Sequence, residues 1–184
     1  MNNNVLVGGY SSSNLDKIYY DEAFLIANYL AQKGYNLVCG CVCGLMNSVS
    51  LAFKNNGKDV QIMETKNDLV DYYPYPMQLF PSVCDRKKAL YSNVSLAIFL
   101  PGGIGTFDEL FGAIEANRCQ DFSYPVIIVN INHYYDNLLS MLETMYNASF
   151  ANEGKRNLYN VVNNVLELDN LLTKSNSLTK KLKQ

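Results

Sequence analysis

The sequence has no strong charge of either sign: 15 lysines and arginines stand against 17 aspartates and glutamates in 184 residues, a net charge of −2. Such a balance provides no electrostatic surface for nucleic acid or for an anionic membrane. No apolar run approaches the roughly 20 residues of a membrane span, and the polar start Met1-Asn2-Asn3-Asn4 is unlike a signal peptide. We therefore expect neither nucleic acid nor a membrane as a partner.

Histidine is nearly absent, and the cysteines lack the usual spacing of a metal site. The only histidine, His133, follows an expected strand, where a structural or exposed role is the simpler interpretation. Cys39, Cys41 and Cys43 alternate and would share one face of a strand. Because zinc sites usually combine CxxC-like pairs with histidine, we expect no metal ion. Small buried cysteines in a reducing cytoplasm are the favoured account.

The sequence does contain a regular alternation of short apolar runs and helical stretches. Its 48% hydrophobic and 17% charged residues are typical of a globular protein, and its length suits one domain over residues 1–184. Helical periodicity is clearest at 16–33 and 45–56, and strands are expected at residues 5–9, 36–40, 60–63, 96–100, 126–130 and 159–162. Continuously apolar strands indicate a parallel sheet that is buried on both faces. The expected fold class is α/β, a three-layer, Rossmann-like, doubly wound parallel sheet with helices on both faces.

Residues 64–82 interrupt this alternation. They hold three of the five prolines and the tyrosine-rich run from Tyr72 to Pro76. Long irregular segments inside compact domains tend to be functional covers or binding loops. We therefore expect an irregular segment, whose tyrosines pack internally, contact a second subunit or stack on a base.

The most informative stretch is LPGGIGTFDEL at residues 100–110, where a buried strand runs into three glycines. These glycines let a ligand approach the backbone. The helix expected from about Thr106 directs free N–H groups and its positive dipole end toward the same edge. The spacing is neither the GxxxxGK[ST] of a P-loop nor GxGxxG, because Asp108 stands where the last glycine is required. The stretch therefore predicts an anion site.

Thr106 and Glu109 leave two interpretations open. Thr106-x-x-Glu109 fits a capping box, in which the threonine caps the helix and the glutamate reaches back to the N–H of the cap residue. Glu109 is equally suited to be a poised carboxylate beside a ligand. The helix alone does not decide between the two.

Two further glycine turns and a basic pair are expected at the same edge. Asp85-Arg86-Lys87-Lys88 opens a helix, where basic groups oppose the helix dipole, and Arg86 is suited to bind a phosphate or ribose bidentately. Gly8-Gly9-Tyr10-Ser11-Ser12 follows the first strand, and residues 39–46 follow the second. Glycine turns after several strands of one parallel sheet predict a nucleotide-sized cleft.

These motifs together resemble a known family. PGGIGTFDE at 101–109 is similar to the pattern PGGxGTxxE, and Arg86-Lys87 stands where that family has an RK pair. GGYSSS (8–13) resembles its GSS turn, CGCVCGLMN (39–47) its YGGGxxGLMG, and PVIIVNINHYYDNLL (125–139) its strand followed by YYDxLL. The chain thus resembles, over most of its length, the LOG family of cytokinin riboside 5′-monophosphate phosphoribohydrolases, also called lysine decarboxylase-like proteins.

The resemblance implies hydrolysis of the N-glycosidic bond of a nucleoside 5′-monophosphate, such as AMP or a cytokinin riboside monophosphate, to free base and ribose 5-phosphate. It implies a homodimer in the cytoplasm, and a chemistry that needs no metal ion or cofactor. The catalytic pair falls on Arg86 and Glu109. The implied phosphate and substrate contacts are Gly102, Gly103, Gly105, Thr106, Lys87, Gly9 and Ser11.

Two alternatives remain, and the chain departs from the family pattern in places. One alternative is a non-hydrolytic nucleotide-binding or sensing protein of the same fold, and the other is an enzyme that transfers 2-deoxyribosyl groups. Cys41, Val42 and Asn47 replace family glycines, and Val83 replaces the methionine of MxxRK. These departures bear on the preferred base more than on the reaction, because both charged residues are retained.

Overall fold

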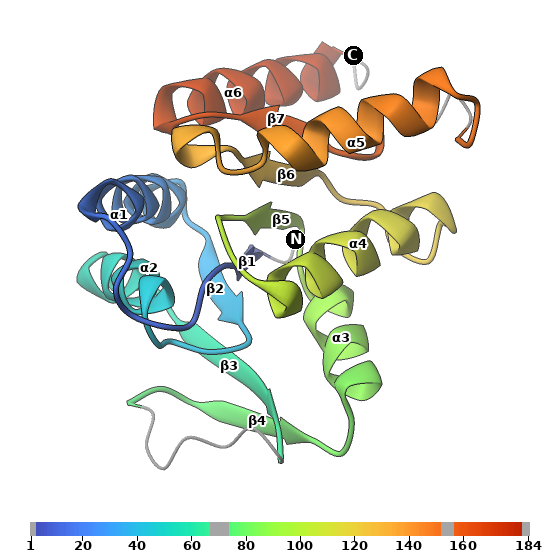
Figure 1. The fold of residues 1–184 in the computed structure, drawn as a ribbon. Coiled ribbons are helices and arrows are strands. Elements are labelled where there is room, and N and C mark those ends of the chain that lie inside the picture. Colours follow the sequence, from blue (N-terminus) through green and yellow to red (C-terminus); the bar gives the residue numbers. More distant parts are fainter. Residues whose placement is uncertain (1–2, 67–73, 152–156, 182–184) are drawn as a thin grey trace.

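The computed structural model describes residues 3–66, 74–151 and 157–181, and it shows a sheet between two layers of helices (Figure 1). The strands are β1 (Asn4–Gly8), β2 (Asn36–Cys39), β3 (Val60–Thr65), β4 (Met77–Phe80), β5 (Leu96–Phe99), β6 (Val126–Val129) and β7 (Asn160–Val162). The helices are α1 (Lys17–Gln32), α2 (Leu45–Asn55), α3 (Val83–Ser92), α4 (Ile104–Arg118), the 3₁₀ turn η1 (Ile131–His133), α5 (Asp136–Asn147) and α6 (Val165–Lys181). Every strand expected from the sequence is present, with small shifts at its ends.

The order of the strands across the sheet is β4-β3-β2-β1-β5-β6-β7, and all neighbouring strands run parallel. The chain builds outward from β1 to β4, returns to place β5 beside β1, and then builds outward in the other direction. In open α/β sheets, ligands bind beyond the carboxyl ends of the strands where the order reverses in this way. The ends of β1 and β5 mark that point in this protein.

Helices cover both faces of the sheet, which confirms the doubly wound class. One buried cluster includes residues of α1, α2 and α6, and the other includes residues of α3 and α4, with Leu138 and Leu139 of α5 packed against it. Figure 1 shows α1 and α2 on one side of the sheet and α3 and α4 on the other. Alternate residues of β1 serve the two clusters, with Val5 and Val7 in one and Leu6 in the other, as the period of a strand requires.

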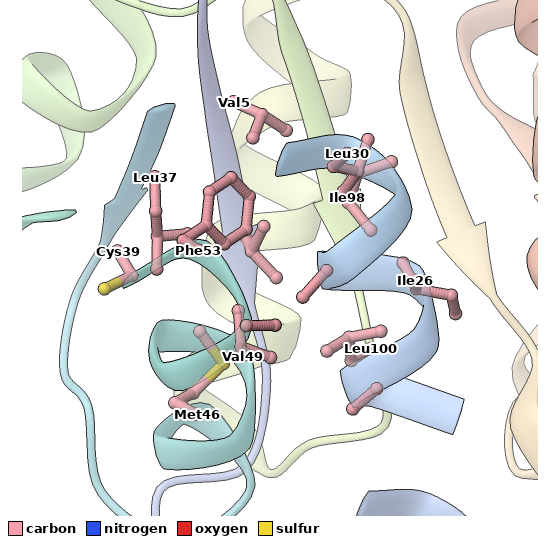
Figure 2. Packing of buried hydrophobic residues seen from close by; sticks show 14 of the residues in the cluster. Val5, Ile26, Leu30, Leu37, Cys39, Met46, Val49, Phe53, Ile98 and Leu100 are labelled. Atoms are coloured by element: carbon pink, nitrogen blue, oxygen red, sulfur yellow. The ribbon is translucent and has the colours of Figure 1, made fainter. Parts of the chain in front are cut away.

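The first cluster fixes the strands whose ends form the site. Figure 2 shows Ile26 and Leu30 of α1, and Phe53 of α2, packed over strand residues such as Val5 and Ile98. All five side chains are essentially inaccessible to solvent. Because each fully buried aliphatic or aromatic side chain contributes about 1.5–3 kcal/mol, β1 and β5 are firmly held where their carboxyl ends meet.

β4 is the one strand that sequence patterns did not predict, because it lies inside the segment 64–82 that we expected to be irregular. It lies at one edge of the sheet, and Met77 and Leu79 are 36% and 39% exposed. It therefore lacks the continuous apolar run of the buried strands. Tyr72 and Tyr73 lie outside the described residues, whereas Tyr75 packs against the cluster of α1 and α2.

The cysteines also differ from expectation. β2 ends at Cys39, so Cys41 and Cys43 lie beyond the strand and do not share its face. Cys39 is buried, Cys41 and Cys43 are partly exposed, and Cys84 and Cys119 are exposed. The expectation of small buried cysteines therefore holds fully for Cys39 alone.

Candidate active site

A pocket of about 530 Å³ opens at the carboxyl edge of the sheet. Its walls come from the ends of β1 and β3, the loop after β2, the first turns of α3, and the start of α4. These segments are far apart in the sequence, and the parallel sheet brings them together because its carboxyl ends share one edge. The predicted cleft is therefore present as a pocket.

The turn after β5 leads into a helix start that no side chain caps. Gly103 is the N-cap residue of α4, and the first helical hydrogen bond runs from the N–H of Phe107 to the carbonyl oxygen of Gly103 at 3.0 Å. The first N–H groups of a helix have no partner within it, and the first turn of α4 carries no acidic residue. The helix start is thus suited to an anion.

This geometry corrects the capping-box interpretation of Thr106 and Glu109. α4 begins at Ile104, earlier than the sequence indicated, and its cap makes no side-chain hydrogen bond. Thr106 and Glu109 therefore lie inside the helix. The carboxylate of Glu109 is directed instead to Arg86 on α3.

The glycines of the turn differ in what surrounds them. A Cβ atom on Gly102 would stand 2.1 Å from Oγ1 of Thr106, so close packing requires glycine there. A Cβ atom on Gly103 or Gly105 would meet nothing within 4 Å. The space next to the helix start is therefore open. The hydroxyl of Tyr134 stabilises the turn by donating a hydrogen bond to the carbonyl oxygen of Gly102 at 2.5 Å.

Arg86 lies between two buried carboxylates. Its Nη2 is 2.9 Å from Oε1 of Glu109, and its Nη1 is 3.6 Å from Oε1 of Glu64 at the end of β3. The side chains of Arg86, Glu109 and Glu64 are 14%, 9% and 8% exposed in these pairs. A Cβ atom on Gly40 would stand 2.6 Å from Nη1, so glycine in the loop after β2 makes room for the guanidinium.

The local helix cap explains why Arg86 faces the pocket and Lys87 does not. Ser82 caps α3 by accepting a hydrogen bond from the N–H of Asp85 at 3.1 Å, which fixes the first turn. Successive helical side chains point in directions about 100° apart. Arg86 therefore enters the pocket, whereas Nζ of Lys87 forms an ion pair with Oδ1 of Asp108 at 2.7 Å.

Burial raises the pKa of Glu109 from 4.5 to about 7. Arg86 opposes this rise as the nearest positive charge, Lys87 opposes it more weakly, and the charges of Asp108 and Glu64 add to it. A carboxyl group with such a pKa can gain or lose its proton near neutral pH. Perturbed carboxyl groups of this kind, paired with a specific charge inside a pocket, are typical of functional sites.

The pocket brings together most of the residues predicted from the sequence. Those that line it are Arg86, Glu109, Gly103, Gly105, Thr106, Gly9 and Ser11. Gly102 and Lys87 do not line it: Gly102 shapes the turn, and Lys87 is paired with Asp108.

Sequence patterns did not identify Glu64 as a lining residue. Tyr10, Gly40, Cys41 and Cys43 also line the pocket, and they belong to the two glycine turns that were expected at this edge. Glu64 directly follows the strand expected at residues 60–63, so the sequence placed a carboxylate at the carboxyl edge. It was not recognised because Glu64 was assigned to the irregular segment expected at residues 64–82.

No group of three or more His, Cys, Asp or Glu side chains within the described ranges is arranged to hold a metal ion. In the same ranges, the helices are too short or too polar to cross a membrane.

The fold and the pocket define a Rossmann-like α/β protein whose open helix start adjoins a buried Arg–Glu pair. Residues 38–172 match the protein family described as "Possible lysine decarboxylase". Because this match covers most of the chain, the protein belongs to that family, which is the LOG family that its motifs resemble.

Two relatives illustrate the similarity. The cytokinin riboside 5′-monophosphate phosphoribohydrolase LOG2 of Arabidopsis thaliana is 27% identical over 167 residues, which are 88% of this chain and 78% of the relative. A probable enzyme of the same name, LOG4 of Oryza sativa subsp. japonica, is 32% identical over 91 residues, which are 50% of this chain and 40% of the relative.

Solved structures share the fold at lower identity. The Moco carrier protein from Chlamydomonas reinhardtii has a TM-score of 0.69 and 14% identity, covering 95% of this chain and 97% of that one. The molybdenum cofactor binding protein from Rippkaea orientalis has a TM-score of 0.63 and 16% identity, covering 93% and 94%. At such identities the likeness concerns the fold alone.

Proposed function

We propose that this protein is a nucleoside 5′-monophosphate phosphoribohydrolase, which hydrolyses the N-glycosidic bond of AMP or of a cytokinin riboside monophosphate. The observation that carries the proposal is the buried pair of Arg86 and Glu109 in the same pocket as the open start of α4. The names of the relatives support the reaction class.

The start of α4 is the place for the 5′-phosphate. Its first N–H groups and its dipole favour an anion, and the open space at Gly103 and Gly105 lets phosphate oxygens approach the backbone. Thr106 lines the pocket from the first turn of the helix, and Gly9 and Ser11 line the side formed by the loop after β1. Binding energy from the phosphate then positions the ribose for the reaction.

Glu109 accepts the proton of the reacting water. When the C1′–N bond breaks, its electron pair moves to the base and positive charge develops on the ribose, which a nearby carboxylate stabilises. Water adds to C1′ and transfers a proton to Glu109, while the departing base takes up a proton from solvent. The products are the free base and ribose 5-phosphate, and Glu109 returns its proton to solvent.

Arg86 is paired with Glu109 and keeps one N–H donor available for the substrate. Its Nη2 pairs with Glu109, whereas its buried Nε has no hydrogen-bond partner among the described residues. Buried donors are nearly always satisfied in working proteins. A substrate oxygen or a bound water in the pocket is expected to accept this hydrogen bond.

Of the three residues that replace family glycines, only Cys41 lines the pocket. Val42 is buried in the core, and Asn47 is exposed. The side chain of Cys41 narrows the pocket relative to glycine, so we expect it to influence which base is accepted. It is also the feature that favours the alternative of a nucleotide-binding protein without turnover.

The proposal is tested by incubating the purified protein with AMP, the other common nucleoside monophosphates and N6-isopentenyl-AMP. Free base and ribose 5-phosphate are measured by chromatography. We expect release from at least one adenine-type monophosphate. Binding of AMP without release from any substrate would favour the sensing alternative, and exchange of an added free base into the nucleotide would indicate glycosyl transfer.

We also propose that the protein acts as a homodimer. Ile104 and Phe111 on α4 and Val83 on α3 are 86%, 42% and 45% exposed, and a second subunit would cover such apolar side chains. Light scattering coupled to size-exclusion chromatography tests this, with a mass of twice 20.7 kDa expected.

A further inference from the structure

Glu64 is a buried carboxylate of the pocket that no motif identifies. It lies near the end of β3, is 6% exposed and lines the pocket. Its Oε1 accepts a hydrogen bond from the N–H of Thr65 at 2.9 Å and lies 3.6 Å from Nη1 of Arg86. Burying a carboxylate costs free energy unless it is paired and hydrogen-bonded, and Glu64 meets both conditions through Arg86 and Thr65.

The guanidinium of Arg86 is divided between two carboxylates. Arginine and a single carboxylate prefer a bidentate pair with two parallel hydrogen bonds. Arg86 instead makes one hydrogen bond to Oε1 of Glu109, through Nη2, while Nη1 lies toward Glu64. Oε2 of Glu109 lies against Gly8, where an added Cβ atom would stand 3.2 Å from it, and Gly8 lines the pocket.

This division matters for the chemistry of Glu109. A bidentate pair with Arg86 would engage both oxygens of Glu109 and make the carboxylate a weaker base. In the structure, Arg86 pairs with Oε1 of Glu109 alone, and its Nη1 lies toward Glu64. The other oxygen, Oε2, lies next to pocket-lining backbone, where a reacting water can be oriented.

We propose that Glu64 is a positioning residue: it holds the Nη1 end of Arg86 so that Arg86 binds Glu109 through one oxygen and leaves the other for the reaction. This role rests on the proposed hydrolysis at the same site. It concerns a residue that lies outside both the glycine turn and the Arg-Lys pair.

The test compares Glu64→Gln with Asp108→Asn. Each removes one of the negative charges that face Glu109 from β3 and α4, while Arg86 and Lys87 on α3 remain. Gln has the size of Glu and still accepts the hydrogen bond from Thr65. Asp108 contacts Lys87 and not Arg86 in the described interactions, so it is the matched control for charge.

We expect both substitutions to move the acidic limb of the pH profile of kcat/KM to lower pH. Glu64→Gln alone should lower kcat on the plateau, by about 100-fold, the loss that a misplacement of about 1 Å can cause, with KM little changed. Asp108→Asn should keep the plateau value. Glu64→Asp, which retains the charge on a shorter side chain, should recover part of the loss and is the second variant if Glu64→Gln folds poorly.

A plateau kcat of Glu64→Gln equal to that of the wild type would overturn the proposal and leave the proposed function standing. A crystal structure of Glu64→Gln supplies a readout that does not need turnover. We expect the guanidinium of Arg86 to contact both oxygens of Glu109 in it. An unmoved Arg86 would refute the positioning role even if the wild type hydrolyses no monophosphate, a result that would separately refute the proposed function.

Discussion

Replacing Glu109 by glutamine tests whether its carboxylate is catalytic or only structural. The substitution keeps the size and hydrogen-bonding oxygen of the side chain, but removes its charge and its ability to accept a proton. The structure shows no helix cap at Glu109, so no loss of capping is expected. We expect base release to disappear, because the reacting water loses its proton acceptor.

The change in stability follows from the pKa of Glu109, which burial raises from 4.5 in the unfolded chain to about 7 in the folded protein. The folded state therefore holds this proton more tightly, and the associated stability is fully present below about pH 4.5 and lost as the pH rises through about 7. The shift corresponds to about 3 kcal/mol. A glutamine side chain cannot ionise, so the Glu109→Gln variant escapes this loss.

Urea unfolding of both proteins at about pH 5 and about pH 8 measures the effect. Near pH 5, Glu109 is protonated in the folded protein, and the variant should be more stable than the wild type by less than about 1 kcal/mol. Near pH 8, the variant should be more stable by up to about 3 kcal/mol, although it is inactive. Equal destabilisation at both pH values, with residual activity that follows the folded fraction, would show that Glu109 is structural and refute this reasoning.

The geometry of the pocket also makes three other experiments informative. Arg86→Ala leaves Glu64 and Glu109 buried without their shared cation. Base release should therefore vanish, and the melting temperature should fall more at about pH 8 than at about pH 5. An active variant would contradict the role assigned to Arg86. Gly103→Ala should fold normally, because its Cβ enters open space, but it should raise KM for the monophosphate that binds there. Gly102→Ala should instead lower the melting temperature through its contact with Thr106. Equal effects of the two substitutions on folding would argue against an open helix start. The wild-type kcat/KM should rise about tenfold per pH unit up to about 7 and then level off, since only ionised Glu109 accepts the proton; a flat profile from about pH 5 to 8 would exclude that step.

The buried strands of the sheet were predictable because they are continuously apolar. β5 and β6 are buried at every residue, which is the pattern of a parallel sheet covered on both faces. β4 was not predictable in this way, since it exposes most of its residues and lies in a proline-rich stretch. The failure therefore came from the lack of burial, and the strand itself pairs regularly with β3.

The candidate site was predictable where a motif combines glycines with charge. Gly103, Gly105 and Glu109 belong to such a motif, and the pocket brings them together. The capping-box interpretation was wrong although Thr106 and Glu109 have the required spacing, because the helix begins two residues before Thr106. Glu64 was missed because its role depends on the distance between β3 and α3, which is a property of the sheet order and not of any local spacing.

We propose that this pocket breaks the N-glycosidic bond of a phosphorylated nucleoside by using Glu109. The most direct measurement quantifies free base and ribose 5-phosphate from AMP or N6-isopentenyl-AMP, beside the matching nucleoside without its phosphate, for the wild type and Glu109→Gln. We predict equal amounts of base and ribose 5-phosphate from a monophosphate, far slower release from the nucleoside, and none with Glu109→Gln. Release that is equally fast without the phosphate, or that persists in Glu109→Gln, would contradict the claim.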